Sequence, residues 1–456
     1  MAELRDRIEA AIKGHHADYI EMRIEEAEGS RIIYRGRDLE DIGRTATLGG
    51  CVRAMVKGGW GFVSFNSPTR LRDKVALAVR QARIASSDTI QLAPVEPVVD
   101  VVPPFIGKVD PLDIPLPNKK QMLDEYNEIV WSTPGITTSI LGYADGRRRT
   151  ALATSEGTYI EQNKVDVSFR LSAMARADSD VQQSAVSIGS NGDFTVVQGL
   201  QNQVKEVAER AVALLKAPYA KGGEYTVVLD PILAGVFTHE AFGHLSESDF
   251  LYEHEEMKKI MALGRKFGPP ILNIVDGAAV PGLRGSFKYD DEGARSTRTH
   301  LIKEGYLVGR LHSRETAGKM SEGATGNARA LDFRFPPIVR MTNTFIEQGK
   351  TSFNDMIADI KLGVYARNWY GGMTSMEQFT FSAGEAYMIR NGKVAEMLRP
   401  VMLSGNVFAT LQNVEAVGND LHMNQGGGCG KGGQIPLPVS DGSPHIRIRN
   451  LLVGGK

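Results

Sequence analysis

The chain has 456 residues, of which 42% are hydrophobic and 23% charged, with a formal net charge of −1 at pH 7. This composition is that of an ordinary globular protein of two or three domains, and the net charge gives no support to nucleic-acid or membrane binding through a broad basic face. Without a run of about 20 apolar residues, a signal peptide or more than two cysteines, we expect a cytoplasmic protein with no disulfide framework.

The first 216 residues repeat one plan of helix, strand meander and helix. The predicted segments are a helix over 2–13, strands over 18–65, a helix over 68–87, a helix near 118–132, strands over 136–192 and a helix near 197–216. The Pro- and Val-rich stretch between the halves, 88–117, is typical of a linker or an edge segment. We therefore predict an α+β domain over 1–218, with possible halves 1–92 and 110–218.

The two longer helices show clear inner faces. In the helix over 68–87, the apolar spacing predicts an inner face formed by Leu71, Val75, Ala76, Val79 and Ala82. In the helix near 197–216, it predicts an inner face formed by Val204, Val207, Ala208, Ala211 and Leu214.

This amino-terminal region offers little chemistry. Cys51 is interpreted as a small buried hydrophobic residue. The three arginines after Asp145-Gly146 are typical of a solvated hairpin arm: Arg147, Arg148 and Arg149. The region has no Gly-rich turn of the kind that binds nucleotides.

A β-rich second domain is predicted over 219–456. It opens with a β-branched strand at 226–229, followed by Asp230 as a helix N-cap and Pro231 in the first helical position. Asn391-Gly392 between apolar runs indicates a hairpin turn. Further predicted elements are short strands at 272–275, 306–309, 385–389 and 445–449, and a helix near 353–361.

The helix that begins at Asp230 carries the clearest chemical signal. Its apolar residues recur at helical spacing, at Ile232, Leu233, Val236 and Phe237. One turn further, this stripe brings His239, Glu240 and Gly243 onto or beside the buried face. Buried imidazole and carboxylate groups need partners, because unpaired polar groups in a core cost several kcal/mol. A metal ion would be one such partner.

The spacing of the two histidines is unusual. His239 and His244 form H-E-x-x-x-H, whereas the familiar zinc helix has histidines at i and i+4. On a regular helix the two imidazoles would diverge by roughly 140°. A π-bulge narrows this divergence, and Gly243 is a plausible hinge. We therefore predict a kinked metal-binding helix with a kink or bulge near Gly243.

A third metal ligand has several candidates. Glu247 and His254 follow the motif within a charged run, which is more often a solvated surface. Cys429 lies far away in a glycine-rich stretch, residues 425–433, where its sulfur can approach another group closely. Lys431 and a nearby metal would both favour its thiolate.

These motifs resemble those of the TldD/PmbA metallopeptidase family, in its catalytic TldD type. The resemblance rests on His239-Glu240-Ala241-Phe242-Gly243-His244 with Glu247 and Asp249-Phe250, Asp290-Asp291-Glu292-Gly293, Arg340-Met341-Thr342-Asn343-Thr344, Val417-Gly418-Asn419-Asp420 and Gly428-Cys429-Gly430-Lys431. The motifs occur in the expected order, and the resemblance covers essentially the whole chain. One departure is Leu245-Ser246, where the family pattern has a glycine-containing turn.

The resemblance implies a zinc-dependent peptidase that cuts short or unfolded peptides. It implies one Zn²⁺ per active subunit, held by His239, His244 and Cys429, in a dimer that encloses a chamber. The partner would be a second copy or a TldE/PmbA-like paralogue without the metal motif. No membrane or direct nucleic-acid partner is expected.

The chemistry expected at these positions is that of a catalytic zinc with three protein ligands. Glu240 would be the general base that takes the proton of water and returns it to the leaving amine. Asn343, Asn419 or N–H groups of the glycine-rich segment are candidates for stabilising the oxyanion. An extended peptide could pair with an exposed strand edge. The alternatives are a non-catalytic zinc-containing assembly or regulatory subunit, and a regulator of a DNA enzyme.

Overall fold

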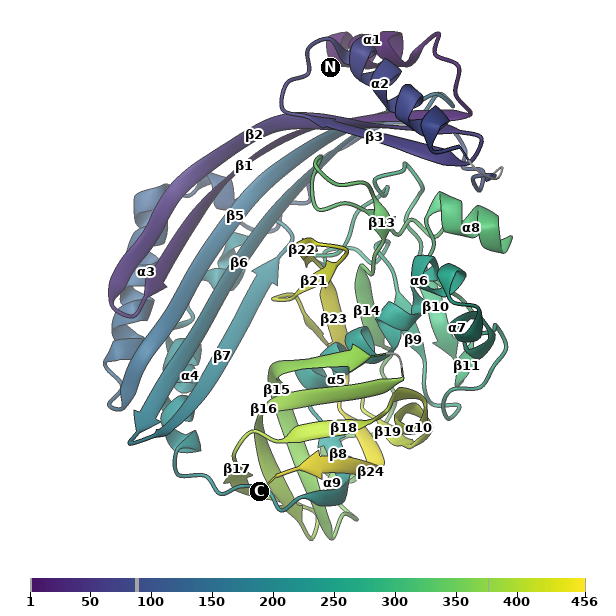
Figure 1. The fold of residues 1–456 in the computed structure, drawn as a ribbon. Coiled ribbons are helices and arrows are strands. Elements are labelled where there is room, and N and C mark those ends of the chain that lie inside the picture. Colours follow the sequence, from purple (N-terminus) through teal and green to yellow (C-terminus); the bar gives the residue numbers. More distant parts are fainter. Residues whose placement is uncertain (1, 87–89, 376, 456) are drawn as a thin grey trace.

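The protein has an α+β fold in which a long curved sheet partly surrounds a β-rich carboxy-terminal part (Figure 1). The computed structural model describes residues 2–86, 90–375 and 377–455. None of the helices formed by these residues combines the length and the apolar character that a membrane span requires.

The amino-terminal elements follow the predicted order of helix, strands and helix, twice. They are α1 (Ala2–Ile12), β1 (Tyr19–Arg35), β2 (Asp38–Val56), β3 (Gly59–Phe65), α2 (Leu71–Ile84), β4 (Val99–Val102), η1 (Pro111–Asp113), α3 (Leu116–Trp131), β5 (Ile136–Thr154), β6 (Tyr159–Ala177), β7 (Asp180–Ser190), η2 (Phe194–Val197) and α4 (Gln201–Leu214). The predicted end of the α2 helix at residue 87 lies outside the described residues.

The two halves are not separate sheets. Strand β1 pairs with β5 along its length, so the strands join in the order β3-β2-β1-β5-β6, with β4 and β7 both on β6. The helices lie on the convex side, α1 and α2 over one end and α3 and α4 over the other (Figure 1). Each helix pair closes its own core on alternate strand residues, because successive side chains of a strand point to opposite faces.

The inner faces of the two longer helices were largely predictable. All five residues predicted for α4 are buried. In α2 the prediction is wrong at one position, since Ala76 is exposed and Ala78 is buried in its place. The predicted linker contains β4, which pairs in parallel with the start of β6 as an edge strand.

The carboxy-terminal part contains a closed ring of five strands. β15 (Leu362–Ser375), β8 (Gly223–Leu229), β24 (Ile446–Gly454), β18 (Met402–Asn406) and β16 (Gln378–Arg390) pair in this order, and β15 also pairs with β16. β17 (Lys393–Leu398) pairs with β16, and β19 (Val414–Val417) pairs with β24. Asn391-Gly392 forms the turn between β16 and β17, as the sequence predicts.

A second sheet lies beside this ring. Its order is β11 (Tyr306–Leu307), β10 (Thr299–Lys303), β9 (Ile274–Asp276), β14 (Asn343–Ile346), β23 (Ser440–Ser443) and β20 (His422–Asn424). Two small hairpin-like pairs are β12 (Ala328–Arg329) with β13 (Ile338–Val339) and β21 (Gly428–Lys431) with β22 (Gln434–Pro438). The remaining helices are α5 (Pro231–Thr238), η3 (His239–Gly243), η4 (His244–Ser246), α6 (Ser248–Glu253), α7 (Glu255–Ile260), α8 (Arg314–Met320), α9 (Phe353–Ile357) and α10 (Val407–Gln412).

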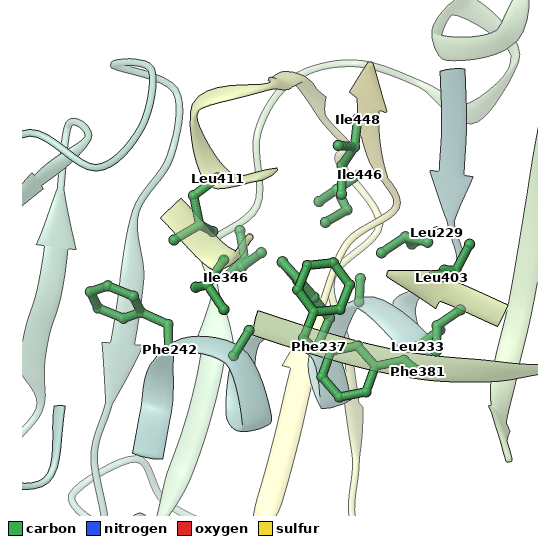
Figure 2. Packing of buried hydrophobic residues seen from close by; sticks show 14 of the residues in the cluster. Leu229, Leu233, Phe237, Phe242, Ile346, Phe381, Leu403, Leu411, Ile446 and Ile448 are labelled. Atoms are coloured by element: carbon green, nitrogen blue, oxygen red, sulfur yellow. The ribbon is translucent and has the colours of Figure 1, made fainter. Parts of the chain in front are cut away.

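Helix α5 is fixed by the core of this part. Figure 2 shows Phe237 of α5 among side chains from the ring, beside Phe381 of β16. The Phe237 ring meets the rings of Phe379 and Phe381 edge-on, with centroids 5.3 and 6.1 Å apart. Edge-to-face packing of this kind is favourable beyond the area that it buries. The helix that leads to the histidine motif therefore has a defined position and rotation.

Two local predictions differ from the structure. The helix predicted near 353–361 ends at Ile357, and the chain then turns so that Ile360 and Lys361 accept hydrogen bonds from the Asn391-Gly392 turn. Arg147, Arg148 and Arg149 are not a solvated hairpin arm. They lie in the middle of β5 and are ion-paired to Asp110, Glu25 and Glu161, respectively.

The N-cap of α5 offers a test of how this helix is held. Asp230 Oδ1 accepts hydrogen bonds from Leu233 N at 2.8 Å and from Asn368 N of β15 at 3.0 Å. We expect Asp230→Ala to lower the free energy of unfolding by about 1–3 kcal/mol, because two N–H groups lose their partner. Chemical denaturation followed by circular dichroism measures the loss. Asp230→Asn, which keeps the accepting oxygen, should lose clearly less, and equal losses would contradict the capping role.

Candidate metal centre

The histidine motif occupies a π-helical turn. Helix α5 runs to Thr238, and the backbone then widens over His239–Gly243, where His244 N donates to His239 O five residues back. A tight turn follows at His244–Ser246. This is the irregularity that the five-residue spacing predicts, and it rotates the second imidazole back toward the first. The two rings have centroids 5.2 Å apart and are nearly perpendicular, at 89°.

Gly243 is required by close packing. A Cβ at this position would lie 2.1 Å from Sδ of Met341, a residue that is fully buried. Any side chain here would displace Met341 or push the turn away from it. The glycine therefore lets the widened turn lie against the segment that enters β14.

His239, His244 and Cys429 come together in space. One ligand atom from each lies within 4.8 Å of the others, and Cys429 Sγ is 3.6 Å from His244 Nε2. His239 and Cys429 are buried, and His239 Nδ1 has no hydrogen-bond partner among the described residues. Two imidazoles and a thiolate around one point are a typical donor set for Zn²⁺. The chemistry of these three donors therefore fits a metal ion.

Glu247 and His254 do not join the cluster as third ligands. Glu247 is buried, and its Oε2 accepts a hydrogen bond from His244 Nδ1 at 2.9 Å, on the ring nitrogen that faces away from Cys429. Lys431 Nζ lies 3.0 Å from the same carboxylate. A carboxylate in this position orients a ligating imidazole and fixes which nitrogen is free to bind a metal. His254 is exposed and bonds Phe250 O instead.

Cys429 lies on a hairpin and not in an open loop. It is on β21, cross-strand from Leu437 of β22. Lys431 of the same strand reaches Asp249 at 2.6 Å and Val339 O at 2.9 Å, which ties the hairpin to the segment after the histidine motif. The hairpin therefore carries both the candidate thiolate and the cation that holds Glu247.

The amino-terminal sheet holds the segment that leads to Cys429. Ser187 of β7 donates to Gly426 O at 2.7 Å, and Arg284 donates to Gly427 O at 2.9 Å. Arg284 is itself paired with Asp166 of β6 at 2.6 Å. A Cβ on Gly426 would lie 2.2 Å from the main-chain oxygen of Ser187, so only glycine permits this contact. The third candidate ligand is thus positioned by both parts of the molecule.

Opposite charges stabilise the cluster. Burial alone would raise the pKa of the Cys429 thiol, but the two imidazoles outweigh it and lower this pKa to about 4. Burial would lower the pKa of His244, but Glu247 and Cys429 raise it to about 11. For Glu247, burial is outweighed by Lys431 and His244, and its pKa falls to about 2. These shifts favour a Cys429 thiolate beside a His244 imidazolium at neutral pH.

Glu240 lies at the open side of the site. Its Oε2 is 4.0 Å from His244 Nε2, and 30% of its side chain is exposed. Asp441 is a second carboxylate near the cluster, and sequence reasoning missed it. Burial raises its pKa to about 6, although the charge of His239 opposes this shift. Its surroundings, Ser440 and Gly442, have the pattern of a turn, so no sequence signal marks it.

The two asparagines proposed for the oxyanion are not equally placed. Asn343 is fully buried, and its amide bonds Gly277 O, Ser286 Oγ and Gly285 N. Because these contacts use both the oxygen and the nitrogen of the side-chain amide, Asn343 has a structural role. Asn419 is exposed on the chain after β19.

The fold and the cluster together define a two-part α+β protein with a largely buried His–His–Cys group suited to a divalent metal ion. Family models match residues 20–85 as PmbA/TldA metallopeptidase domain 1, 109–216 as the central domain and 222–455 as the C-terminal domain. The chain belongs to the PmbA/TldD metallopeptidase family.

Named relatives agree with this assignment. The chain is 49% identical to a metalloprotease of Synechocystis sp. over 96% of this chain and 95% of that protein. It is 33% identical to a zinc metalloprotease TldD homolog of Saccharolobus solfataricus over 71% and 72% of the two chains.

Solved structures share the fold at low identity. TldE from Thermococcus kodakarensis has a TM-score of 0.76 at 18% identity and covers 100% of both chains. A protein of Thermotoga maritima described as a putative modulator of a DNA gyrase has a TM-score of 0.79 at 18% identity, covering 99% of this chain and 100% of its own. These two likenesses show the fold alone.

The charge state of Cys429 can be tested directly. Because its pKa is lowered, the group stays a thiolate as the pH falls, until about pH 4. We expect the ultraviolet thiolate absorbance of the metal-stripped protein, with Cys429→Ser as the blank, to persist through neutral pH and disappear near pH 4. The blank removes any signal from Cys51, whose pKa is raised by burial. His239→Ala should move the midpoint upward, and an ordinary thiol titration in the unaltered protein would contradict the cluster.

Proposed function

We propose that this protein is a zinc-dependent peptidase that hydrolyses short or unfolded peptides. The observation that carries the proposal is the convergence of His239, His244 and Cys429 on one point, with the Glu240 carboxylate 4.0 Å from His244 Nε2. The metalloprotease names of relatives that align over most of the chain support the same reaction class.

The three converging side chains would hold one Zn²⁺ per active subunit. They leave a fourth coordination position, as catalytic zinc sites do. When bound there, zinc acts as a Lewis acid and makes water more acidic. A thiolate donates more charge than an imidazole, so turnover is expected to be slow.

Glu240 is proposed as the general base. It takes the proton of the attacking water and delivers it to the leaving amine. Its partial exposure leaves it accessible to substrate, whereas the buried Glu247 is fully occupied by His244 and Lys431. The two glutamates of this region therefore have separate roles, one in proton transfer and one in orienting His244.

An extended peptide would enter as an added strand. Hairpin β21–β22 forms a two-stranded sheet, and within the described part of the chain no third strand pairs with it. A peptide backbone that pairs with the edge of this two-stranded sheet would pass beside Cys429 whatever the peptide sequence, which favours unfolded substrates.

The proposed assembly is a dimer, with a second copy or with a TldE/PmbA-like paralogue.

Metal content and cleavage of an unfolded peptide test this function together. We expect near-stoichiometric zinc in the unaltered protein and loss of zinc in Cys429→Ala, with Cys51→Ala as the matched control that keeps it. Glu240→Gln should retain zinc but lose about 10²- to 10⁴-fold in kcat, the usual contribution of a general base.

The outcomes separate the ligand from the base. Zinc that survives in Cys429→Ala would show that the thiolate is not a ligand. Full cleavage by Glu240→Gln would remove the proposed base and favour a non-catalytic assembly or regulatory subunit. A native domain cut as fast as its unfolded form would contradict the substrate class.

The role of Glu247 predicts a change in zinc affinity. Glu247→Ala leaves His244 Nδ1 without its acceptor, so the imidazole is no longer oriented. We expect zinc binding to weaken about 10- to 100-fold in a chelator competition assay. Asp249→Asn, which alters the other carboxylate bound by Lys431, is the control. An unchanged affinity in Glu247→Ala would show that this carboxylate only packs the site.

A further inference from the structure

A cavity between the two parts of the molecule carries an excess of positive charge. It has a volume of about 40 Å³ and lies where β5 and β6 face the carboxy-terminal part. Its lining includes Arg148 of β5, Lys164 of β6 and Arg329 of β12, together with Phe287, Tyr289 and Leu437. This volume holds a few water-sized groups, about what a carboxylate needs.

Two of these three cations have no carboxylate partner. Among the described residues, no hydrogen bond or ion pair involves Lys164 Nζ, which lies 4.3 Å from the centroid of the Phe287 ring. Arg329 is buried, and it donates to main-chain oxygens, Met341 O at 2.6 Å and Pro438 O at 2.7 Å. Of the three, Arg148 alone forms an ion pair with a carboxylate among the described residues, with Glu25 at 2.5 Å.

The acidic residues at this cavity already have partners. Asp291 pairs with Arg23 at 3.2 Å and accepts a hydrogen bond from Ala330 N at 2.8 Å. Asp290 accepts three main-chain N–H bonds, from Glu292, Ala294 and Ala328. These contacts engage both carboxylates, and neither makes an ion pair with Lys164 or Arg329 among the described residues. Asp291 still attracts both cations from a distance, but burial outweighs this effect on their pKa values.

The cost of keeping two positive charges in this buried place lowers the pKa values of Lys164 and Arg329. Burial and then Arg329 lower the pKa of Lys164 to about 7. Burial and then Arg340 lower the pKa of Arg329 to about 10. An anion between them would offset both the burial and the mutual repulsion, because an opposite charge within a few ångströms favours the charged form.

A larger cavity adjoins this one. It has a volume of about 340 Å³ and shares Gln162, Lys164 and Phe287 with the smaller cavity. Apolar side chains of Val102, Phe105 and Pro281 contribute to its lining. A flexible chain could therefore occupy the wide part while its charged group reaches Lys164.

The cavity is joined to the candidate metal centre by two direct links. Leu437 lines the cavity and is the cross-strand neighbour of Cys429. Arg329 donates to Met341, whose sulfur packs against Gly243 in the histidine turn. A group bound at Lys164 thus lies against the same hairpin that carries the candidate thiolate.

We propose that this cavity binds a carboxylate of the peptide substrate, with Lys164 and Arg329 as its charge partners. The proposal rests on the peptidase function and adds a substrate preference to it. The carboxylate comes from the peptide C-terminus or from an acidic side chain. Charge-assisted hydrogen bonds to both cations would select such peptides over neutral ones.

Matched peptides bound to the zinc-loaded full chain carrying Glu240→Gln test this inference. Three unstructured peptides with an amino-terminal fluorophore are compared by fluorescence anisotropy: one with a free C-terminal carboxylate, its C-terminal amide, and an amide in which one internal Gln is Glu. We expect at least one carboxylate-bearing peptide to bind about 10- to 100-fold more tightly than the neutral amide. The one that does so identifies the source of the carboxylate.

Variants of Lys164 then assign the site. Lys164→Met should abolish the preference, Lys164→Arg should keep part of it, and Lys303→Met, an exposed lysine on β10, should keep all of it. Equal binding of all three peptides, or a full preference in Lys164→Met, would overturn the proposal. If Lys164→Met fails to fold, as judged by circular dichroism, Lys164→Gln takes its place with the same expected loss.

Mass spectrometry of the recovered peptides separates this result from the peptidase proposal. Peptides cleaved by Glu240→Gln count against the proposed base, whatever the binding preference. Intact peptides with no carboxylate preference count against the cavity alone.

Discussion

His239 and His244 converge because the backbone between them widens into a π-helical turn, and the rest of the site depends on that turn. A widened turn leaves main-chain groups outside the regular helical pattern, and these need partners. Ser246 supplies one, since its hydroxyl donates to Phe242 O at 3.0 Å. Thr238 donates similarly to Ala234 O at 2.8 Å at the end of α5. Ser246 thus has a structural role at the position where the family pattern has a glycine-containing turn.

The curved sheet completes the site as well as covering it. Ser187 and the Arg284–Asp166 pair hold the glycine-rich segment before Cys429. A further buried ion network, Glu21–Arg53–Glu292, fastens the other end of the sheet to the carboxy-terminal part. Buried ion pairs tolerate little loss of geometry, because a separated partner is left as an uncompensated charge. The position of the candidate thiolate therefore depends on how the two parts dock.

Features of this structure that depend on neighbouring residues can be predicted from the sequence, whereas features that depend on residues far apart in the chain cannot. The Asp230 cap, the Asn391-Gly392 turn and the distortion near Gly243 are encoded within a few residues, and all three are present. The pairing of β1 with β5, which merges the two halves, depends on contacts across more than a hundred residues and has no local signature. The three arginines of β5 were misread for the same reason, since their partners lie on other strands and segments.

The candidate ligands show a similar division. The histidines stand out by their spacing and Cys429 by its glycine-rich surroundings, and the structure brings all three together. Glu247 could be identified as a candidate from sequence, but its role could not, because a carboxylate three residues after a histidine is compatible with a ligand, an orienting group or a surface charge. Its burial and its bond to the outward ring nitrogen decide among these.

The charges of the site explain why the thiolate is ready before a metal arrives. The two imidazoles outweigh burial and lower the pKa of the Cys429 thiol to about 4, which favours the thiolate at neutral pH. A metal that binds must displace a proton from His244, whose pKa Glu247 and Cys429 raise to about 11. The carboxylate that orients this imidazole thus also competes for its proton. Lys431 Nζ, 3.0 Å from Glu247, stabilises the ionised form of this carboxylate and, with His244, lowers its pKa to about 2.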